Sequence, residues 1–266
     1  MSVELRYEYK YFVPMDKIDL LRKMIRPYTV LDKFADSQPD KHYTVRSIYF
    51  ETPDFECYWT KLAHNKHRNK VRLRGYNLED GKNLVFMEIK RKYEAPILKN
   101  RAPLLFEDFK KVLRNEKKLE DFLTNDGKMK NALDNSKRFF YNVYARKMKP
   151  VVTVIYEREP FLSAYNNPDN NLRITFDKNL RGCPYPTIDD LFSEKHVQYT
   201  LRGHFILEVK FNQFCPAWMK AIIGTLGLHK ESASKYCMCI DAHNMIKTNN
   251  RFDTLSHGRM FREYYD

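Results

Sequence analysis

Residues 6–13 read Arg-Tyr-Glu-Tyr-Lys-Tyr-Phe-Val, so charged side chains alternate with aromatic ones at the start of the chain. Side chains two residues apart lie on the same face of a β-strand, and this stretch therefore predicts a strand with one charged and one aromatic face. The same alternation recurs at residues 70–74 (Lys-Val-Arg-Leu-Arg), 88–92 (Glu-Ile-Lys-Arg-Lys) and 207–210 (Leu-Glu-Val-Lys). Cations are concentrated on the charged faces, and a Glu repeatedly precedes a Lys by two positions. The pattern predicts a sheet whose charged face binds polyanions.

The wider sequence predicts an α+β fold with an extensive antiparallel sheet. Period-two alternation predicts strands at residues 4–12, 43–51, 68–76, 84–92, 151–159, 171–177 and 204–212. Helices are expected from Pro14 to about Ile25, over 106–123 and 128–147, from Pro216 onward, and over 232–246. Asn, Asp, Gly and Pro predict surface loops at 165–171 and 182–189, and the tail 248–266 is polar.

Length, charge and cysteine content narrow the class of protein. The 266 residues, of which 43% are hydrophobic, suit one folded domain over residues 1–266. Lys and Arg number 47 against 34 Asp and Glu, and the net charge of +13 favours an anionic partner. No stretch is apolar enough to cross a bilayer and charges interrupt Met1–Tyr11, so we expect a soluble, cytoplasmic chain. The five cysteines lack paired CxxC spacing, which favours reduced structural thiols over a zinc site.

The charged strand faces suggest where an anion binds. If the sheet closes into a barrel with helices packed outside, these faces line a polar interior wide enough for a ligand. The expected phosphate cradle consists of Lys10, Arg72, Arg74, Lys90, Arg158 and Arg173. Glu8, Glu88 and Glu208 would offset the cations when no ligand is bound. Such carboxylates also suit Mg²⁺ or Mn²⁺, and Glu208 is the first candidate for a metal ligand.

Taken together, these stretches resemble the VTC polyphosphate polymerase domain, within the superfamily of triphosphate tunnel metalloenzymes. The resemblance rests on residues 6–13, 47–52 (Ser-Ile-Tyr-Phe-Glu-Thr), 70–76 and 88–90. It continues through 156–158, the strand around Arg173, 207–210 and 232–236, and so extends from about Leu5 to Ile246.

This resemblance implies a closed eight-stranded antiparallel β-barrel, a triphosphate tunnel, with Mn²⁺ or Mg²⁺ as cofactor. The catalytic residues that it implies are Arg72, Arg74, Lys90 and Glu208. The implied phosphate-binding residues are Lys10, Arg72, Arg74, Lys90, Arg158, Arg173, Lys210, Ser234 and Lys235. Glu208, with Glu8 and Glu88, would provide the metal ligands.

One departure from the superfamily pattern bears on the reaction. The first strand of the superfamily reads Glu-x-Glu-x-Lys, whereas Arg6 stands at the first acidic position here and removes a metal ligand. We therefore expect a phosphotransferase that moves the γ-phosphate of ATP onto a polyphosphate chain, rather than a two-metal hydrolase.

Two other functions remain open from the sequence. A triphosphatase would use a metal-activated water in place of the phosphate acceptor, and a non-catalytic module would only bind polyphosphate or nucleic acid. Nucleic acid is disfavoured because the strand cations face away from their aromatic neighbours, which therefore do not interleave with them as base-stacking platforms. The sequence leaves the oligomeric state open.

Overall fold

The structure is a computed structural model, and it describes residues 6–78, 82–93, 97–124, 129, 131–164 and 172–246. The chain divides into two compact units. The first unit comprises Met1–Thr44, Tyr156–Arg181 and Gln198–Asp266, and the second comprises Val45–Ile155 and Gly182–Val197. The expectation of a single domain over residues 1–266 stays a prediction.

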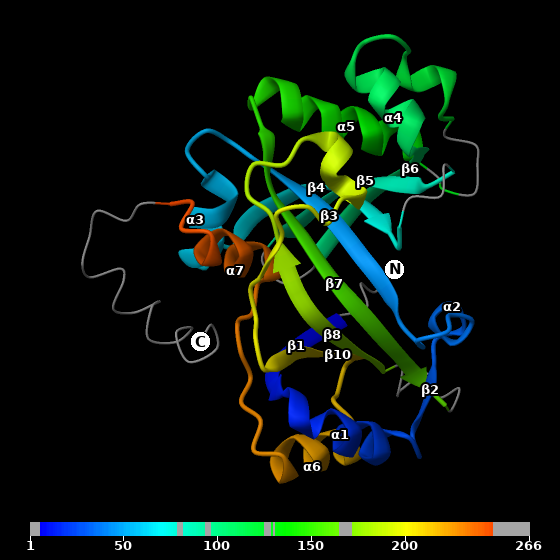
Figure 1. Ribbon diagram of the computed structural model, residues 1–266, viewed down its shortest axis with the longest axis vertical. Helices are drawn as coiled ribbons and strands as arrows, with labels where there is room; N and C mark the ends of the chain where they lie inside the picture. The colour runs from blue at the N-terminus through cyan, green and yellow to red at the C-terminus, as the bar shows by residue number, and fades with distance from the viewer. Residues whose placement is uncertain are drawn as a thin grey trace. The chain divides into compact units, whose positions relative to one another are not determined.

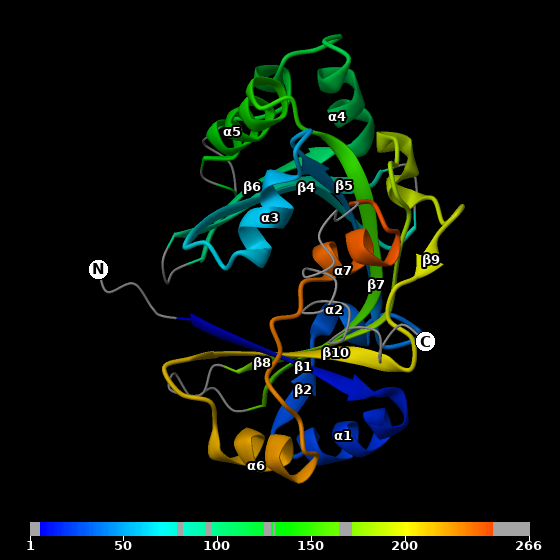
Figure 2. The ribbon, with the colours of Figure 1, turned by 90° about the vertical axis from the view of Figure 1, so that its left-hand side faces the viewer.

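The first unit is built around an antiparallel sheet in which β10 (His204–Asn212) lies between β1 (Arg6–Pro14) and β8 (Arg173–Gly182). Its other elements are η1 (Met15–Lys17), α1 (Ile18–Ile25), β2 (Thr29–Leu31), α2 (Lys33–Asp36), the C-terminal part of β7 (Lys149–Ser163), β9 (Gln198–Tyr199), α6 (Ala217–Thr225) and α7 (Lys235–Ala242). Helices α1 and α6 lie side by side along one face of this sheet (Figures 1 and 2). They cover its apolar side.

Alternation along the strands forms the core of this unit. Phe205, Leu207 and Val209 of β10 are fully buried and pack with Leu21 of α1 and Met219 of α6. Glu208 and Lys210 of the sequence motif alternate with these residues along β10 and lie on the opposite face. The helices therefore bury the apolar face and leave the charged face of the strands away from the core.

The second unit has an antiparallel sheet in the order β3 (Tyr43–Glu51), β4 (His67–Tyr76), β5 (Leu84–Tyr93) and β6 (Ile97–Leu105). Its remaining elements are α3 (Glu56–Leu62), α4 (Phe106–Leu113), η2 (Leu119–Asp121), α5 (Ala132–Ala145), η4 (Ile188–Phe192) and the N-terminal part of β7. Helices α4 and α5 cover one face of β5 and β6 (Figure 1).

The core of the second unit follows the same rule. Leu73 of β4 and Met87 of β5 are buried among Phe109 of α4 and Phe139 of α5. The charged residues next to them along the strands are Arg and Glu, which lie on the other face of the sheet. Each unit therefore has an apolar core on one face of its sheet and charged side chains on the other.

The expectation of a closed eight-stranded barrel is wrong. The described part of the chain contains ten strands, and their hydrogen-bonded order is β1, β10, β8, β7, β3, β4, β5 and β6, with β2 paired to β7 and β9 paired to β8. Within the described residues this order does not close, because β1 pairs only with β10 and β6 pairs only with β5. Closure requires the first and last strands to share a ladder of hydrogen bonds. The broader prediction, an antiparallel sheet with helices, is confirmed.

Several predicted boundaries also differ from the structure. Strand β6 was not expected, because its sequence Ile-Leu-Lys-Asn-Arg-Ala-Pro-Leu-Leu breaks the alternation and includes Pro103; a strand at the edge of a sheet tolerates this Pro. The helix expected over 106–123 ends as α4 at Leu113 and is followed by a separate turn, η2. The expected loop at 165–171 and the tail 248–266 lie outside the described residues.

We expect Gly75→Ala to destabilise the fold by about 1–3 kcal/mol, because its Cβ would lie 2.7 Å and 2.9 Å from ring atoms of Phe192 on η4. Gly224 in α6 is the matched control, since an added Cβ meets no atom within 4 Å there, and Gly224→Ala should stabilise by about 0.5–1 kcal/mol. Urea unfolding measures both changes. A neutral Gly75→Ala would contradict the close packing of η4 on β4.

Candidate functional site

Strands β1 and β10 bring the two Glu-x-Lys motifs of the first unit together. Their antiparallel register places Glu8 opposite Lys210 and Lys10 opposite Glu208. The ammonium of Lys10 lies 3.1 Å from Glu8 and 3.7 Å from Glu208, and that of Lys210 lies 3.6 Å from Glu8 and 3.2 Å from Glu208. Each carboxylate contacts both lysines, so the four side chains form a checkerboard of alternating charge.

Glu208 is the most heavily paired carboxylate of this face. Beyond the checkerboard, its oxygens lie 2.7 Å from Lys235 and 3.4 Å from Arg158. Its side chain is only 6% exposed. Burial by itself would raise the pKa of this carboxyl, but the surrounding lysines and Arg158 outweigh burial and hold the pKa well below its usual range. Glu208 is therefore ionised at neutral pH.

Lys235, which belongs to helix α7, lies next to Glu208 on the charged face of the first unit. The side chain of Ser234 caps the helix by accepting a hydrogen bond from the backbone N–H of Cys237, and Lys235 is the first residue of the helix. The ammonium of Lys235 also lies 2.5 Å from Asp177 and 4.9 Å from the ring centre of Tyr156. Burial opposes its charge, but Asp177 and Glu208 raise the pKa of Lys235. It is a buried ammonium held by two carboxylates.

The segment just before α7 is tied to β1. The ammonium of Lys10 donates a 3.0 Å hydrogen bond to the carbonyl of Ala233, and the backbone N–H of Glu231 donates to the carbonyl of Lys10. Burial opposes the charge of Lys10, yet Glu8 and Glu208 raise its pKa. Lys10 thus links the checkerboard to the start of α7.

Two arginines complete the charged face of the first unit. Arg158 of β7 donates to both oxygens of Asp177, at 2.7 Å from Nε and 2.6 Å from Nη2. Arg173 of β8 lies opposite Lys210, and its buried Nε has no hydrogen-bond partner among the described residues. The same holds for the buried hydroxyl of Thr175. Such buried donors are rare without a ligand or water.

The second unit has its own charged cluster, centred on Glu88. Arg72 of β4 lies opposite Glu88 of β5 and donates to one carboxylate oxygen, at 2.8 Å from Nε and 2.5 Å from Nη2. Its third nitrogen donates to the hydroxyl of Tyr49 at 2.8 Å. Arg74 donates a 3.3 Å hydrogen bond to the hydroxyl of Ser47. Tyr49 and Ser47 belong to β3, so both arginines predicted from the sequence contact side chains of that strand.

Strand β6 contributes two cations that the sequence reasoning missed. Lys99 lies 2.7 Å and Arg101 lies 3.2 Å from Glu88, whose side chain is 1% exposed. The guanidinium of Arg101 also stacks on Phe86, 3.4 Å from the ring centre. Burial by itself raises the pKa of Glu88, but Arg72, Arg74 and Lys99 lower it overall. The sequence did not predict β6, and the positions of Lys99 and Arg101 next to Glu88 follow only from the pairing of β6 with β5.

Lys90 lies in a row of like charges. It is paired in register with Lys70 on β4 and with Lys99 on β6. Cations directly opposite each other repel. Burial lowers the pKa of Lys99, and neighbouring arginines lower it further against the opposing effect of Glu88. This row is a place where an anion would relieve repulsion.

The predicted site residues therefore fall into two groups. The first unit contains Glu8, Lys10, Arg158, Arg173, Glu208, Lys210, Ser234 and Lys235. The second unit contains Arg72, Arg74, Glu88 and Lys90. Within each group the strand register brings predicted charges together. Asp177, Lys99 and Arg101 are the additions that the structure makes.

A divalent cation fits the first unit better than the second. Glu8 and Glu208 lie on neighbouring strands and share two lysines, and their oxygens are of the type that Mg²⁺ and Mn²⁺ prefer. An ion there would replace lysine contacts. In the second unit the residues opposite Glu88 on the neighbouring strands are Arg72 and Arg101, so no second carboxylate lies across from it. Across the described residues, no group of three or more His, Cys, Asp or Glu side chains is arranged for a metal.

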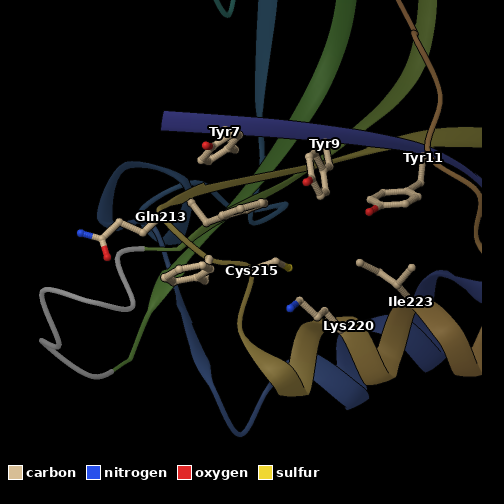
Figure 3. Close-up of a pocket in the computed structure, with 9 residues that line it drawn as sticks. Tyr7, Tyr9, Tyr11, Gln213, Cys215, Lys220 and Ile223 are labelled. Carbon is tan, nitrogen blue, oxygen red and sulfur yellow. The ribbon is translucent and has the colours of Figure 1, made fainter. Parts of the chain in front are cut away.

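The face of β1 opposite the checkerboard forms a different kind of surface. Figure 3 shows Tyr7, Tyr9 and Tyr11 above Cys215 and Lys220, around a cavity of about 250 Å³. Tyr11 is buried, and burial together with Cys215 and Tyr9 raises its pKa to about 12. The three tyrosines present their rings away from the Glu-x-Lys motif, as the alternation predicts.

A family model for the VTC domain matches residues 5–244. The chain belongs to the VTC domain family. This VTC domain is 27% identical over 262 residues to vacuolar transporter chaperone complex subunit 4 of Schizosaccharomyces pombe, an alignment that covers 83% of the chain. The match spans only 35% of that relative. The family membership confirms the resemblance seen in the sequence.

Solved structures give weaker likenesses. A proposed adenylate cyclase from Bacillus halodurans is 13% identical, with a TM-score of 0.45 and coverage of 95% of this chain and 96% of that one. A second, from Vibrio parahaemolyticus, is 11% identical, with a TM-score of 0.43 and coverage of 89% and 98%. Both TM-scores are below 0.5, and neither likeness supports a conclusion. Among the described helices, none has the length and apolar character needed to span a bilayer.

We expect Glu88→Gln to destabilise the VTC domain by about 3 kcal/mol at pH 7, because Arg72, Lys99 and Arg101 lose their shared counter-charge. The lowered pKa of Glu88 stabilises the fold above the ordinary value of 4.5, and this contribution is lost as pH falls below it. The variant should therefore show a flatter loss of stability below about pH 4.5. Urea unfolding between pH 3 and 7 measures it.

The exposed Glu116 provides the control for this measurement, since it has only a 3.9 Å contact with Arg114. Glu116→Gln should leave the free energy of unfolding within about 0.5 kcal/mol of wild type. Equal effects of the two substitutions would contradict the central role given to Glu88.

Proposed function

We propose that this VTC domain is a metal-dependent phosphotransferase that transfers the γ-phosphate of ATP to a polyphosphate chain. The observation that carries the proposal is the surplus of partly or fully buried cations in the first unit. Five cations, Lys10, Arg158, Arg173, Lys210 and Lys235, share one face with three carboxylates, a net charge of +2. Desolvated surplus charge of this kind is stable only with an anion or water. Family membership supports a phosphate chain as that anion.

The proposed reaction needs no protein nucleophile. An oxygen of the terminal phosphate of the chain attacks the γ-phosphorus of ATP and forms a new P–O–P bond. The bond between the γ-phosphorus and the β–γ bridging oxygen breaks, and ADP leaves with its electron pair. The protein aligns the two phosphates and stabilises charge on the transferred group.

The two units have different roles in the proposed reaction. In the second unit, Arg72, Arg74 and Lys90 contact the transferred phosphoryl group, and their guanidinium and ammonium groups neutralise its oxygens. In the first unit, Lys10, Arg158, Arg173, Lys210, Ser234 and Lys235 bind the phosphate chain. Glu208 keeps the first-unit cations ordered in the absence of ligand, since four of them lie within 3.7 Å of its oxygens.

The proposed cofactor is Mn²⁺ or Mg²⁺, held by Glu208 with Glu8 and by phosphate oxygens. When bound, it supplies positive charge to those oxygens. ATP and polyphosphate are the proposed partners, and the cytoplasmic location expected from the sequence stays a prediction. Because the chain spans about a third of its relative, the activity of that longer protein is itself part of the proposal.

Product analysis tests the reaction directly. Purified protein incubated with ATP and Mn²⁺ should yield ADP and polyphosphate chains in matching amounts of phosphate, resolved by gel electrophoresis and ion-exchange chromatography. Free phosphate without chains would identify a triphosphatase instead. Binding of polyphosphate with no turnover would leave only a binding module. Incubation with tripolyphosphate in place of ATP controls for hydrolysis.

We expect Glu208→Gln to abolish turnover, by at least about 100-fold, while polyphosphate binding persists through the remaining cations. The control is Glu159→Gln, which removes a buried carboxylate of the same unit that binds Arg22 and Lys178 instead. Its activity per folded molecule should match wild type. Turnover that survives in Glu208→Gln would reject the role of this carboxylate.

A further inference from the structure

Asp177 is the most completely buried charged residue of the first unit. It lies on β8, opposite Ile206 of β10, and its side chain is 0% exposed. Arg173, Thr175 and Asp177 are alternate residues of β8 and so share one face of the strand. Asp177 therefore faces the charged side of the sheet. The sequence offered no sign of its importance, because a single Asp near the end of a strand is ordinary.

The contacts of Asp177 link two cations from distant parts of the chain. Both oxygens accept from Arg158 of β7, at 2.7 Å and 2.6 Å, and one also contacts the ammonium of Lys235 of α7 at 2.5 Å. The bidentate geometry fixes the plane of the guanidinium as well as its position. One carboxylate therefore orients the arginine and, together with Glu208, holds the lysine.

The orientation leaves one nitrogen of Arg158 for a ligand. Asp177 binds Nε and Nη2, and Nη2 also contacts Glu208 at 3.4 Å. Within the described part of the chain, Nη1 has no hydrogen-bond partner. The arginine is thus anchored on one side and has an unused donor on the other.

We propose that Asp177 is a positioning residue for phosphate-chain binding: it holds Arg158 and Lys235 in the geometry that phosphate oxygens require, without touching the chain itself. This inference rests on the proposed function, because it assigns both cations to phosphate. The fixed guanidinium presents Nη1 to the ligand. The ordering of two long side chains occurs during folding and not during binding.

Charge alone gives the opposite expectation. Asp177 is an anion on a face that binds anions, so Asp177→Asn raises the net positive charge of the cluster. If Asp177 only reduced that charge, the substitution would strengthen the binding of polyphosphate. If Asp177 positions the cations, binding weakens although the net charge rises. The sign of the change therefore separates the two roles.

The test measures the affinity of the 266-residue chain for a defined polyphosphate, by calorimetry and without ATP, for wild type and Asp177→Asn. We expect affinity to fall at least fivefold. Unchanged or tighter binding would overturn the proposal. Because this readout needs no turnover, a wild type that binds but does not polymerise defeats the proposed reaction and leaves the role of Asp177 intact. A wild type that does not bind polyphosphate defeats both.

Glu159 supplies a matched control in the same unit. It is a buried carboxylate that accepts from Nε and Nη2 of Arg22, at 2.8 Å and 2.7 Å, and contacts Lys178 at 3.3 Å. Being adjacent to Arg158 on β7, it faces the opposite side of the strand. Glu159→Gln should lower the melting temperature as Asp177→Asn does and leave polyphosphate affinity within twofold of wild type. An equal loss of affinity in both variants would reduce Asp177 to a structural role.

A second comparison keeps the proposal testable if Asp177→Asn does not fold. The double variant Asp177→Asn with Arg158→Gln replaces the buried ion pair by a neutral pair that can still form hydrogen bonds. Positioning predicts that it binds polyphosphate at least threefold more weakly than Arg158→Gln alone, since Lys235 then keeps only Glu208 of its two carboxylate partners. Equal or tighter binding by the double variant would contradict the proposal.

Discussion

The organisation of this VTC domain depends on compensating partly buried cations with buried carboxylates. Arginine and lysine side chains lie on sheet faces where solvent reaches them poorly, and desolvation of such groups is costly unless counter-charges are close. In the first unit Glu208 and Asp177 meet this need, and in the second unit Glu88 does. Each of these carboxylates contacts more than one cation. The positive charge needed for phosphate is thereby kept in a folded, ordered form before any ligand arrives.

This compensation explains why the same motif appears on several strands. A Glu two residues before a Lys places both charges on one face, and the antiparallel neighbour supplies the complementary pair. On β5 the partner strands offer mostly cations, and Glu88 is consequently contacted from both sides. In both units carboxylates offset the charge of neighbouring cations, but the ratio of carboxylates to cations differs. In both units helices cover the apolar face of the strands.

Much of this arrangement could be predicted from the sequence, because period-two alternation is a local property. The strands around Lys10, Arg72 and Glu208, and the sidedness of their charges, follow from residue order alone. Strand β6 could not be predicted, since Asn100 and Pro103 break its pattern and its place depends on pairing with β5. Asp177 was equally hidden, because its partners come from β7 and α7. The closed barrel was inferred from resemblance, and the described strands do not form it.

The checkerboard of β1 and β10 also restricts how these two strands can pair during folding. A slip of one residue would turn every charged side chain to the apolar face, where the core of the first unit forms. A slip of two residues would keep the faces but bring Glu8 opposite Glu208 in one direction, and Lys10 opposite Lys210 in the other. Misaligned pairings of either kind are unfavourable, so the charges that face the ligand also specify a single strand register. Strands that are far apart in the chain pair late in folding, and such a restriction on register helps them most.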